Sequence, residues 1–252
     1  MSPSSPTGLP IGSAPSEEDV QATGADAGSR KQSKPRRRAP APGRRLLNFD
    51  RSLGVRFVAG ADEAGRGSLA GPLVAAGVLL DMERLGPAQA RALGKLNDSK
   101  QQTPEGRAAL YPVILGLASR VAIVTRCAPG IDARGLHKTN LAALRDALHA
   151  VAVDGCICLS DGFPVSGLDH DRRAVIGGDA KSAAIAAASV LAKETRDRYM
   201  RRADESHPGW EFAQHVGYST PEHREAIERI GLSPLHRLSF QSIAYQQLAL
   251  GG

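Results

Sequence analysis

From residue 57 onward, short apolar runs alternate with longer stretches in which apolar residues recur at helical spacing. Short apolar runs bounded by Gly, Pro or Asp are typical of buried strands, whereas a spacing of three or four residues is typical of helices. Helical stretches follow and interleave with the predicted strands, so the pattern predicts an α/β or α+β domain with a central sheet. We expect strands at 56–61, 72–80, 120–125, 157–160 and 175–176.

Helix signals are clearest in the middle of the chain. Thr103 followed by Pro104 predicts a helix start, with Thr as the cap and Pro in the first turn. Four leucines at helical spacings predict a helix over residues 132–150. A long helix is expected from about residue 181 to 200, short helices and loops from about 207, and a turn at 97–100.

The first 48 residues show no such periodicity. They are rich in Pro, Ser, Ala, Gly and Arg, and they lack the apolar content that would offset the entropy of ordering. We therefore expect a disordered tail over residues 1–48 and one folded domain over 49–252.

The basic residues are unevenly distributed along the chain, whose net charge is +6. Eight basic residues and no acid lie between Arg30 and Arg45, and subtracting this +8 leaves −2 for the rest of the chain. A basic tail can raise affinity for any polyanion in a salt-dependent way. A purely solubilising extension explains the same charge equally well, so both interpretations stay open.

The cysteine count and the hydropathy pattern exclude several classes of protein. Cys127, Cys156 and Cys158 are an odd number with one C-x-C pair, which argues against a disulfide framework and a zinc site and favours plain core or strand residues. No apolar run approaches the length needed to span a bilayer, and the N-terminal residues do not resemble a signal peptide. We expect a cytoplasmic protein with no membrane contact.

Four acids lie at or just after the ends of predicted strands: Asp62, Glu63, Asp161 and Asp179. Converging carboxylates repel one another unless a cation holds them, and oxygen ligands suit Mg²⁺ or Mn²⁺. Two such ions can activate a water and stabilise the leaving oxygen of a phosphodiester. A solvated turn would explain one Asp-Glu pair, but four acids that each close an apolar segment favour a metal-dependent nuclease.

A glycine-rich loop, Gly65-Arg66-Gly67, follows the first two acids. With Ala70 it satisfies the loose dinucleotide-binding pattern, which requires a helix to begin at the glycines. Pro72 and a second apolar strand follow instead, so a hairpin is the better prediction. Glycines also let backbone N–H groups approach a substrate closely, which would suit a sugar-phosphate backbone; an ordinary tight turn is the simpler alternative.

Several segments together resemble the signature of the ribonuclease HII family, in the family's order, over about residues 55–242. The longest is residues 60–76, GADEAGRGSLAGPLVAA. The others are residues 96–100, 161–162, 178–179, 185–193, 196–197, 217–220 with His223, and 236–240. One departure lies at Gly130 and Gly135, where many relatives have Glu-Ile-Asp followed by Asn; it affects a local loop and helix start and none of the four acids.

The resemblance implies a ribonuclease H-like fold, with a central mixed sheet flanked by helices and a helical C-terminal extension. It implies cutting of RNA in RNA–DNA hybrids and on the 5′ side of single ribonucleotides in duplex DNA, leaving 3′-hydroxyl and 5′-phosphate ends. The implied partner is nucleic acid, the expected state is a monomer, and the cofactor is Mn²⁺ or Mg²⁺. The resemblance also makes the four acids the catalytic metal ligands.

Roles for the remaining site residues follow from the same resemblance. Gly65, Arg66 and Gly67 look like the loop that reads the 2′-hydroxyl, and Tyr218 like the residue that packs on the adjoining deoxyribose. Alone, Tyr218 would be a half-buried core residue. The implied phosphate contacts are Lys100, Ser189 and Lys193, of which the last two lie four residues apart on one helix face.

Other interpretations are weighed against this one. His223 and His236 lie within the matching segments, where we expect packing or hydrogen bonding and no metal role. A junction resolvase or integrase-like enzyme should lack the glycine loop and Tyr218. A catalytically inactive hybrid-binding protein should lack one of the four acids. A glycosidase is a poor fit because Asp62 and Glu63 are adjacent in a strand and would point to opposite faces. Residues 246–250 also fit a sliding-clamp peptide, although a simple helix end is the better interpretation.

Overall fold

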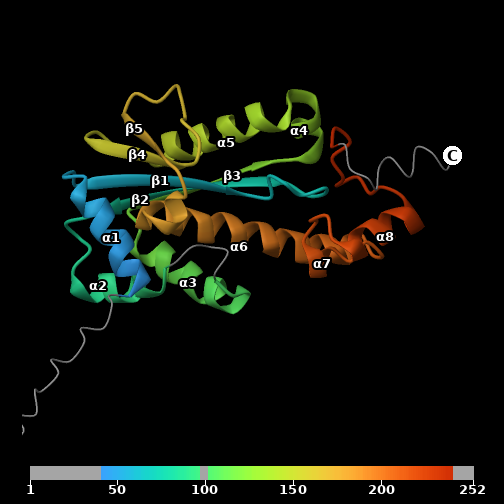
Figure 1. The fold of residues 1–252 in the computed structure, drawn as a ribbon, viewed down its shortest axis with the longest axis horizontal. Coiled ribbons are helices and arrows are strands. Elements are labelled where there is room, and N and C mark those ends of the chain that lie inside the picture. Colours follow the sequence, from blue (N-terminus) through green and yellow to red (C-terminus); the bar gives the residue numbers. More distant parts are fainter. Residues whose placement is uncertain (1–40, 97–101, 241–252) are drawn as a thin grey trace, which may run out of the picture. The chain divides into compact units, whose positions relative to one another are not determined.

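A five-stranded mixed sheet forms the centre of the folded domain in this computed structural model, which describes residues 41–96 and 102–240 (Figure 1). The strand order is β3-β2-β1-β4-β5; the β2–β1 and β3–β2 pairs are antiparallel, and β4 and β5 run parallel to β1. The strands are β1 (Phe57–Ala64), β2 (Leu73–Asp81), β3 (Arg120–Arg126), β4 (Cys156–Asp161) and β5 (Asp171–Val175).

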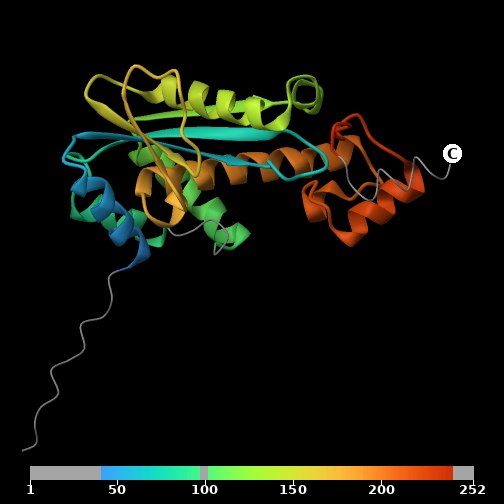
Figure 2. The same ribbon diagram turned by 45° about the horizontal axis from the view of Figure 1, so that its top comes forward.

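Helices cover both faces of the sheet. They are α1 (Pro42–Ser52), α2 (Pro87–Ala92), α3 (Pro104–Leu117), α4 (Ala128–Arg134), α5 (Leu136–Val151), α6 (Ala183–Ser206), α7 (Phe212–His215) and α8 (Pro221–Ile230), with 3₁₀ turns η1 (Leu93–Lys95) and η3 (Gly178–Ala180). Figures 1 and 2 show α5 on one face and α6 with α1 and α3 on the other. None of the described helices is long and apolar enough to cross a membrane.

Helix α6 packs directly against the backbone of the central strand β1. A Cβ atom added at Gly60 would lie 2.3 Å from the carbonyl carbon of Ala184, so only glycine permits this approach. The first half of α6 is almost entirely Ala, Ile, Val and Leu and is fully buried. This close packing aligns α6 with β1, so that Ser189 comes beside Asp62.

The strands and helices predicted from the hydrophobic pattern are largely confirmed. The segment after β1 is a hairpin to β2, as the break at Pro72 indicated, and Thr103 caps α3 by accepting a hydrogen bond from the N–H of Gly106. The expected strand at 175–176 is instead 171–175. The single helix expected over 132–150 was wrong in its first part: Gly135 has φ +81° and separates α4 from α5.

The predicted boundary of the disordered tail, at residue 48, is also wrong. Helix α1 begins at Pro42, and Leu46 and Leu47 are 0% exposed in the core. Asp50 of α1 accepts a hydrogen bond from the N–H of Ala184 at 2.9 Å and so caps α6 from outside. Residues 42–48 therefore belong to the folded domain; residues 1–40 and the suggested clamp peptide at 246–250 lie outside the described residues.

All three cysteines are free thiols. Cys156 and Cys158 are buried in β4, as expected of core or strand residues, whereas Cys127 is exposed just before α4.

Candidate active site

The four predicted acids line one pocket of about 630 Å³, which lies at the carboxyl ends of the inner strands β1 and β4. Ala61 of β1 pairs with Ser160 of the parallel strand β4, so the next residues, Asp62 and Asp161, lie at the same level, just beyond the last pair between these two strands. Glu63 follows in β1, and Asp179 comes from η3. The N–H of Gly178 donates to Asp161 Oδ1 at 2.6 Å, which joins η3 to the end of β4.

Burial and mutual repulsion act on the adjacent acids of β1. Burial raises the pKa of Asp62 well above its ordinary value, and the charges of Glu63 and Asp161 raise it further, against a hydrogen bond with Ser189. The pKa of Glu63 is also raised, first by burial, although Arg66 and Asn140 oppose the shift. Carboxylates that repel in this way are stabilised by a nearby cation.

The donor set fits a hard divalent cation. It consists of carboxylate oxygens, the ligands that Mg²⁺ and Mn²⁺ prefer, and the described residues put no His or Cys in this pocket. Within residues 41–96 and 102–240, no three His, Cys, Asp or Glu side chains lie close enough together to form a metal-binding cage by themselves. Mg²⁺ usually binds through one or two carboxylates, with water and substrate phosphates completing its shell, so such a cage is not required.

The glycine loop forms the next wall of the pocket. Gly65, Arg66 and Gly67 all line it, immediately after the two acids of β1. The Arg66 guanidinium lies over the ring of Phe163, 4.5 Å from its centroid, which holds this cation on the β4 side of the pocket.

Helix α6 and the loop after α7 contribute the other predicted residues. Ser189, Lys193 and Tyr218 line the pocket. Lys193 Nζ lies 4.9 Å from the centre of the Tyr218 ring, and the Arg196 guanidinium lies 5.2 Å from it. Tyr218 is half-buried beside two cations. Lys100, the remaining predicted phosphate contact, lies outside the described residues.

Three further residues belong to the site and were not predicted: Gln102, Arg107 and Asn140. Arg107 lines the pocket from the first turn of α3, Gln102 lines it from just before that helix, and Asn140 of α5 lies close enough to Glu63 to lower its pKa. A single Gln, Arg or Asn carries no sequence signal of its own. Arg107 and Asn140 become site residues only through the packing of their helices, and Gln102 through its place just before α3.

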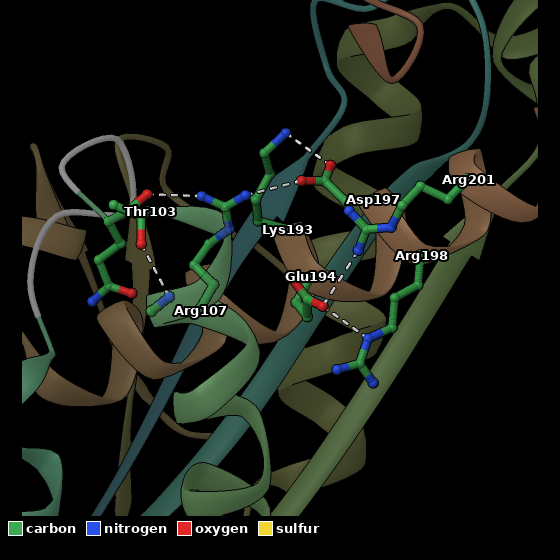
Figure 3. A network of polar contacts seen from close by, with 9 residues as sticks. Thr103, Arg107, Lys193, Glu194, Asp197, Arg198 and Arg201 are labelled. Carbon is green, nitrogen blue, oxygen red and sulfur yellow. Dashed lines mark hydrogen bonds and ion pairs between the residues drawn. The ribbon is translucent and has the colours of Figure 1, made fainter. Parts of the chain in front are cut away.

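A buried carboxylate joins the pocket cations of two helices (Figure 3). Asp197 of α6 accepts from Arg107 of α3 at 3.1 Å and from Lys193 at 2.8 Å. Arg107 also donates to the carbonyl of Gln102 at 2.9 Å. One turn away, buried Glu194 pairs with Arg198 and Arg201 on the outer side of α6. Asp197 thus fixes two positive charges at the pocket wall.

The sheet order and strand directions, with carboxylates at the ends of the two central strands, define a nuclease with a ribonuclease H-like fold. A family model described as ribonuclease HII matches residues 59–243, and the chain belongs to that family. It is therefore a hydrolase, an endoribonuclease acting on RNA–DNA.

Relatives of known family agree with this assignment. The ribonuclease HII of Salinispora tropica is 48% identical over 202 residues, covering 79% of this chain and 73% of the relative. That of Mycobacteroides abscessus is 46% identical over 197 residues, covering 78% and 82%. The predicted family is thereby confirmed.

Solved structures confirm the predicted fold. Ribonuclease H2 of Pyrococcus horikoshii matches with a TM-score of 0.62 and 23% identity, covering 76% of this chain and 96% of that one. The PCNA:RNase HII complex of Archaeoglobus fulgidus matches with a TM-score of 0.61 and 24% identity, covering 74% and 96%. Bst-RNase HIII in complex with Mn²⁺ matches with a TM-score of 0.58 and 20% identity, covering 80% and 72%.

Proposed function

We propose that this enzyme incises duplex DNA on the 5′ side of single embedded ribonucleotides, and degrades RNA in hybrids, by two-metal-ion hydrolysis that leaves 3′-hydroxyl and 5′-phosphate ends. The observation that carries the proposal is that the acids and the glycine loop line one pocket. A phosphodiester at the acids and the ribose beside it can therefore contact the protein together. The Mn²⁺ complex of the related Bst-RNase HIII supports a divalent ion as cofactor.

In this proposal the four acids hold the cations against a scissile phosphate. When bound, divalent ions supply the charge that activates a water and stabilises the leaving oxygen. Asp62 would ionise as a cation binds, because the cation offsets the burial and repulsion that raise its pKa. Ser189 keeps Asp62 oriented through their hydrogen bond.

Positive residues around the acids bind the flanking phosphates. Lys193 faces the pocket with its charge fixed by Asp197, and Arg107 is held beside it by the same carboxylate. Lys100 is assigned the same role from its motif.

In this proposal, the glycine loop and Tyr218 select the ribonucleotide. Backbone N–H groups of residues 65–67 would hydrogen-bond the 2′-hydroxyl, the group that distinguishes RNA from DNA. Tyr218 would pack on the neighbouring deoxyribose, where a 2′-hydroxyl would clash. The two recognition elements are joined directly, because the N–H groups of Leu69 and Ala70 donate to the carbonyl of Gly217 at 2.9 and 3.2 Å.

The test is cleavage of duplex DNA carrying one ribonucleotide, in Mg²⁺, Mn²⁺ or EDTA. We expect Asp62→Asn, Asp161→Asn and Asp179→Asn each to lower the rate by roughly 10³-fold or more, because several kcal/mol of metal-borne charge stabilisation is lost. Asp154→Asn is the matched control, an exposed acid outside the pocket that should retain full activity. Parent-like cutting by Asp179→Asn would refute the site, and equal cutting of all-DNA duplex would refute the selectivity.

A further inference from the structure

Arg237 is 0% exposed, and its guanidinium donates hydrogen bonds to backbone carbonyls of the glycine loop and of the residues after it. Nη2 donates to the carbonyl of Gly65 at 2.6 Å, and Nη1 donates to that of Arg66 at 2.9 Å. Nε and Nη2 also donate to the carbonyl of Gly71, at 3.1 and 2.9 Å. The planar fork of one side chain therefore fixes both ends of the turn between β1 and β2.

These bonds determine the direction of the loop's N–H groups. In a planar trans peptide, the carbonyl of one residue and the N–H of the next point in opposite directions. Since the carbonyls of Gly65 and Arg66 point to Arg237, the N–H groups of Arg66 and Gly67 point away from it. Both residues line the catalytic pocket, whereas Arg237 does not. Among the described residues, neither N–H donates a hydrogen bond to the protein.

The same contacts affect donor strength. A cation bound to a carbonyl polarises that peptide unit, because hydrogen bonds in a chain strengthen one another in a low-dielectric interior. Donors held rigidly before the ligand arrives also lose little energy to reorganisation. Arg237 thus both aims and polarises the two donors that face the pocket.

The segment that carries Arg237 is itself tied down on two sides. Its own N–H donates to the carbonyl of Leu69 at 2.8 Å, and the neighbouring His236 forms a β-bridge with Ala70. On the other side, Asp132 of α4 accepts from the N–H groups of residues 238 and 239, at 2.9 and 3.0 Å. The fork therefore has a defined position relative to the loop.

We infer that Arg237 is the positioning residue that sets the selectivity of the Gly65–Gly67 loop for a ribose 2′-hydroxyl. The inference rests on the proposed function, because it assumes that this loop reads the 2′-hydroxyl. Arg237 acts through the two N–H groups and makes no contact with the substrate.

Binding selectivity tests this inference without relying on the cleavage rate. Affinities for a duplex with one ribonucleotide and for the same all-DNA duplex are measured in Mg²⁺ by fluorescence anisotropy. All proteins carry Asp179→Asn, so that cleavage does not deplete the substrate. Arg237→Lys keeps the charge but loses the fork. We expect it to weaken ribonucleotide-duplex binding roughly tenfold while all-DNA binding changes less than about twofold.

Two further variants separate positioning from general stability. Asp132→Asn removes part of the anchoring of residues 238–239, so the retained Arg237 fork is held less rigidly against the loop and selectivity should fall by a smaller factor. This variant tests the inference if Arg237→Lys does not fold. Val151→Ala, a core change on α5, serves as a control for lowered stability and should leave selectivity unchanged.

The outcomes are distinguishable. Equal weakening for both duplexes, or unchanged selectivity in a folded Arg237→Lys protein, would overturn the positioning role. If Arg237→Lys is unfolded, unchanged selectivity in Asp132→Asn would overturn it. A parent protein that binds both duplexes equally would instead refute the proposed function, on which the inference rests.

Discussion

At the scale of single residues, the two glycines of the loop are there for different reasons. Gly65 has φ +82°, and a Cβ atom there would lie 2.0 Å from Nε of the buried Arg196. The fold itself therefore requires glycine at 65. A Cβ at Gly67 would meet no atom within 4 Å, so the folded protein has room for a side chain there. Under the proposed function, close approach of the substrate to the backbone would account for glycine at 67.

This difference predicts opposite outcomes for the two alanine variants. Gly67→Ala should change the free energy of unfolding by less than about 0.5 kcal/mol, while KM for a single-ribonucleotide duplex rises roughly tenfold. Gly65→Ala should lower the free energy of unfolding by about 1–3 kcal/mol, because of backbone strain and the clash. Urea unfolding and steady-state cleavage measure the two effects. Parent-like KM in Gly67→Ala would mean that the substrate does not approach this backbone.

The sequence predicts the acids better than it predicts their surroundings. Asp62 and Asp161 each close an apolar run, and the parallel pairing of those two runs brings them together. The effect of Asn140 on the pKa of Glu63 and the ion pair of Arg107 with Asp197 depend on how α5 and α3 pack. Packing of helices is not encoded in a local pattern, which is why these partners appear only in the structure.

At the scale of elements, a cluster of three buried histidines fixes the loop that carries Tyr218. His223 Nδ1–H donates to the carbonyl of Tyr218 at 2.9 Å, so its Nε2 accepts from Nε2–H of His236 at 3.1 Å. His236 Nδ1 in turn accepts from the N–H of Ser233. His215 stacks on His223 with ring centroids 4.1 Å apart and accepts from the N–H of Gly217 at 3.1 Å. Every bond in this chain requires neutral rings.

Acid should therefore destabilise the C-terminal region. Burial lowers the pKa of His223 to about 3 and that of His236 to about 4. The unfolded chain binds protons below pH 6.5 while the folded rings stay neutral, so stability is fully present above pH 6.5 and falls as pH decreases toward 4. At pH 5 the loss is about 2 kcal/mol for each histidine.

Urea unfolding at pH 7.5 and pH 5 measures this loss. His223→Gln, which retains a polar side chain but does not titrate, should show a smaller difference between the two pH values than the parent. An equal difference would show that other groups cause the acid sensitivity. The prediction that His223 and His236 serve packing and hydrogen bonding is confirmed by their contacts.

Elements with a long periodic pattern, such as α5 and α6, were predictable. Helix α1 was not, because eleven residues following a Pro- and Arg-rich segment offer little apolar content. Its stability comes from tertiary packing of Leu46 and Leu47 and from Asp50 at the start of α6.

At the scale of the whole molecule, the basic residues of the N-terminal region form one dense cluster. Residues 1–40 contain six of the eight clustered basic residues, whereas Arg44 and Arg45 lie in α1. Neutralising a phosphate releases counterions, so each basic residue that does so steepens the salt dependence of nucleic-acid binding.

Deletion of residues 1–40 tests whether the segment binds nucleic acid. If it does, the slope of log affinity against log salt should become shallower by about 0.9 for each phosphate that the segment had neutralised, while cleavage selectivity is unchanged. The comparison protein keeps its full length and replaces the six basic residues with Gln. An unchanged slope in both proteins would favour the solubilising role.

The hairpin from β1 to β2 has a consequence for where the enzyme cuts. Glu63 and Gly65 are two residues apart on one continuous backbone, so they are separated by at most about 7 Å. Under the proposed function, the covalent length of the hairpin backbone sets the distance between the ribose that the loop binds and the phosphodiester bond that is broken. Substitutions in the loop should then change how often the enzyme cuts, but the cut should stay at the same bond.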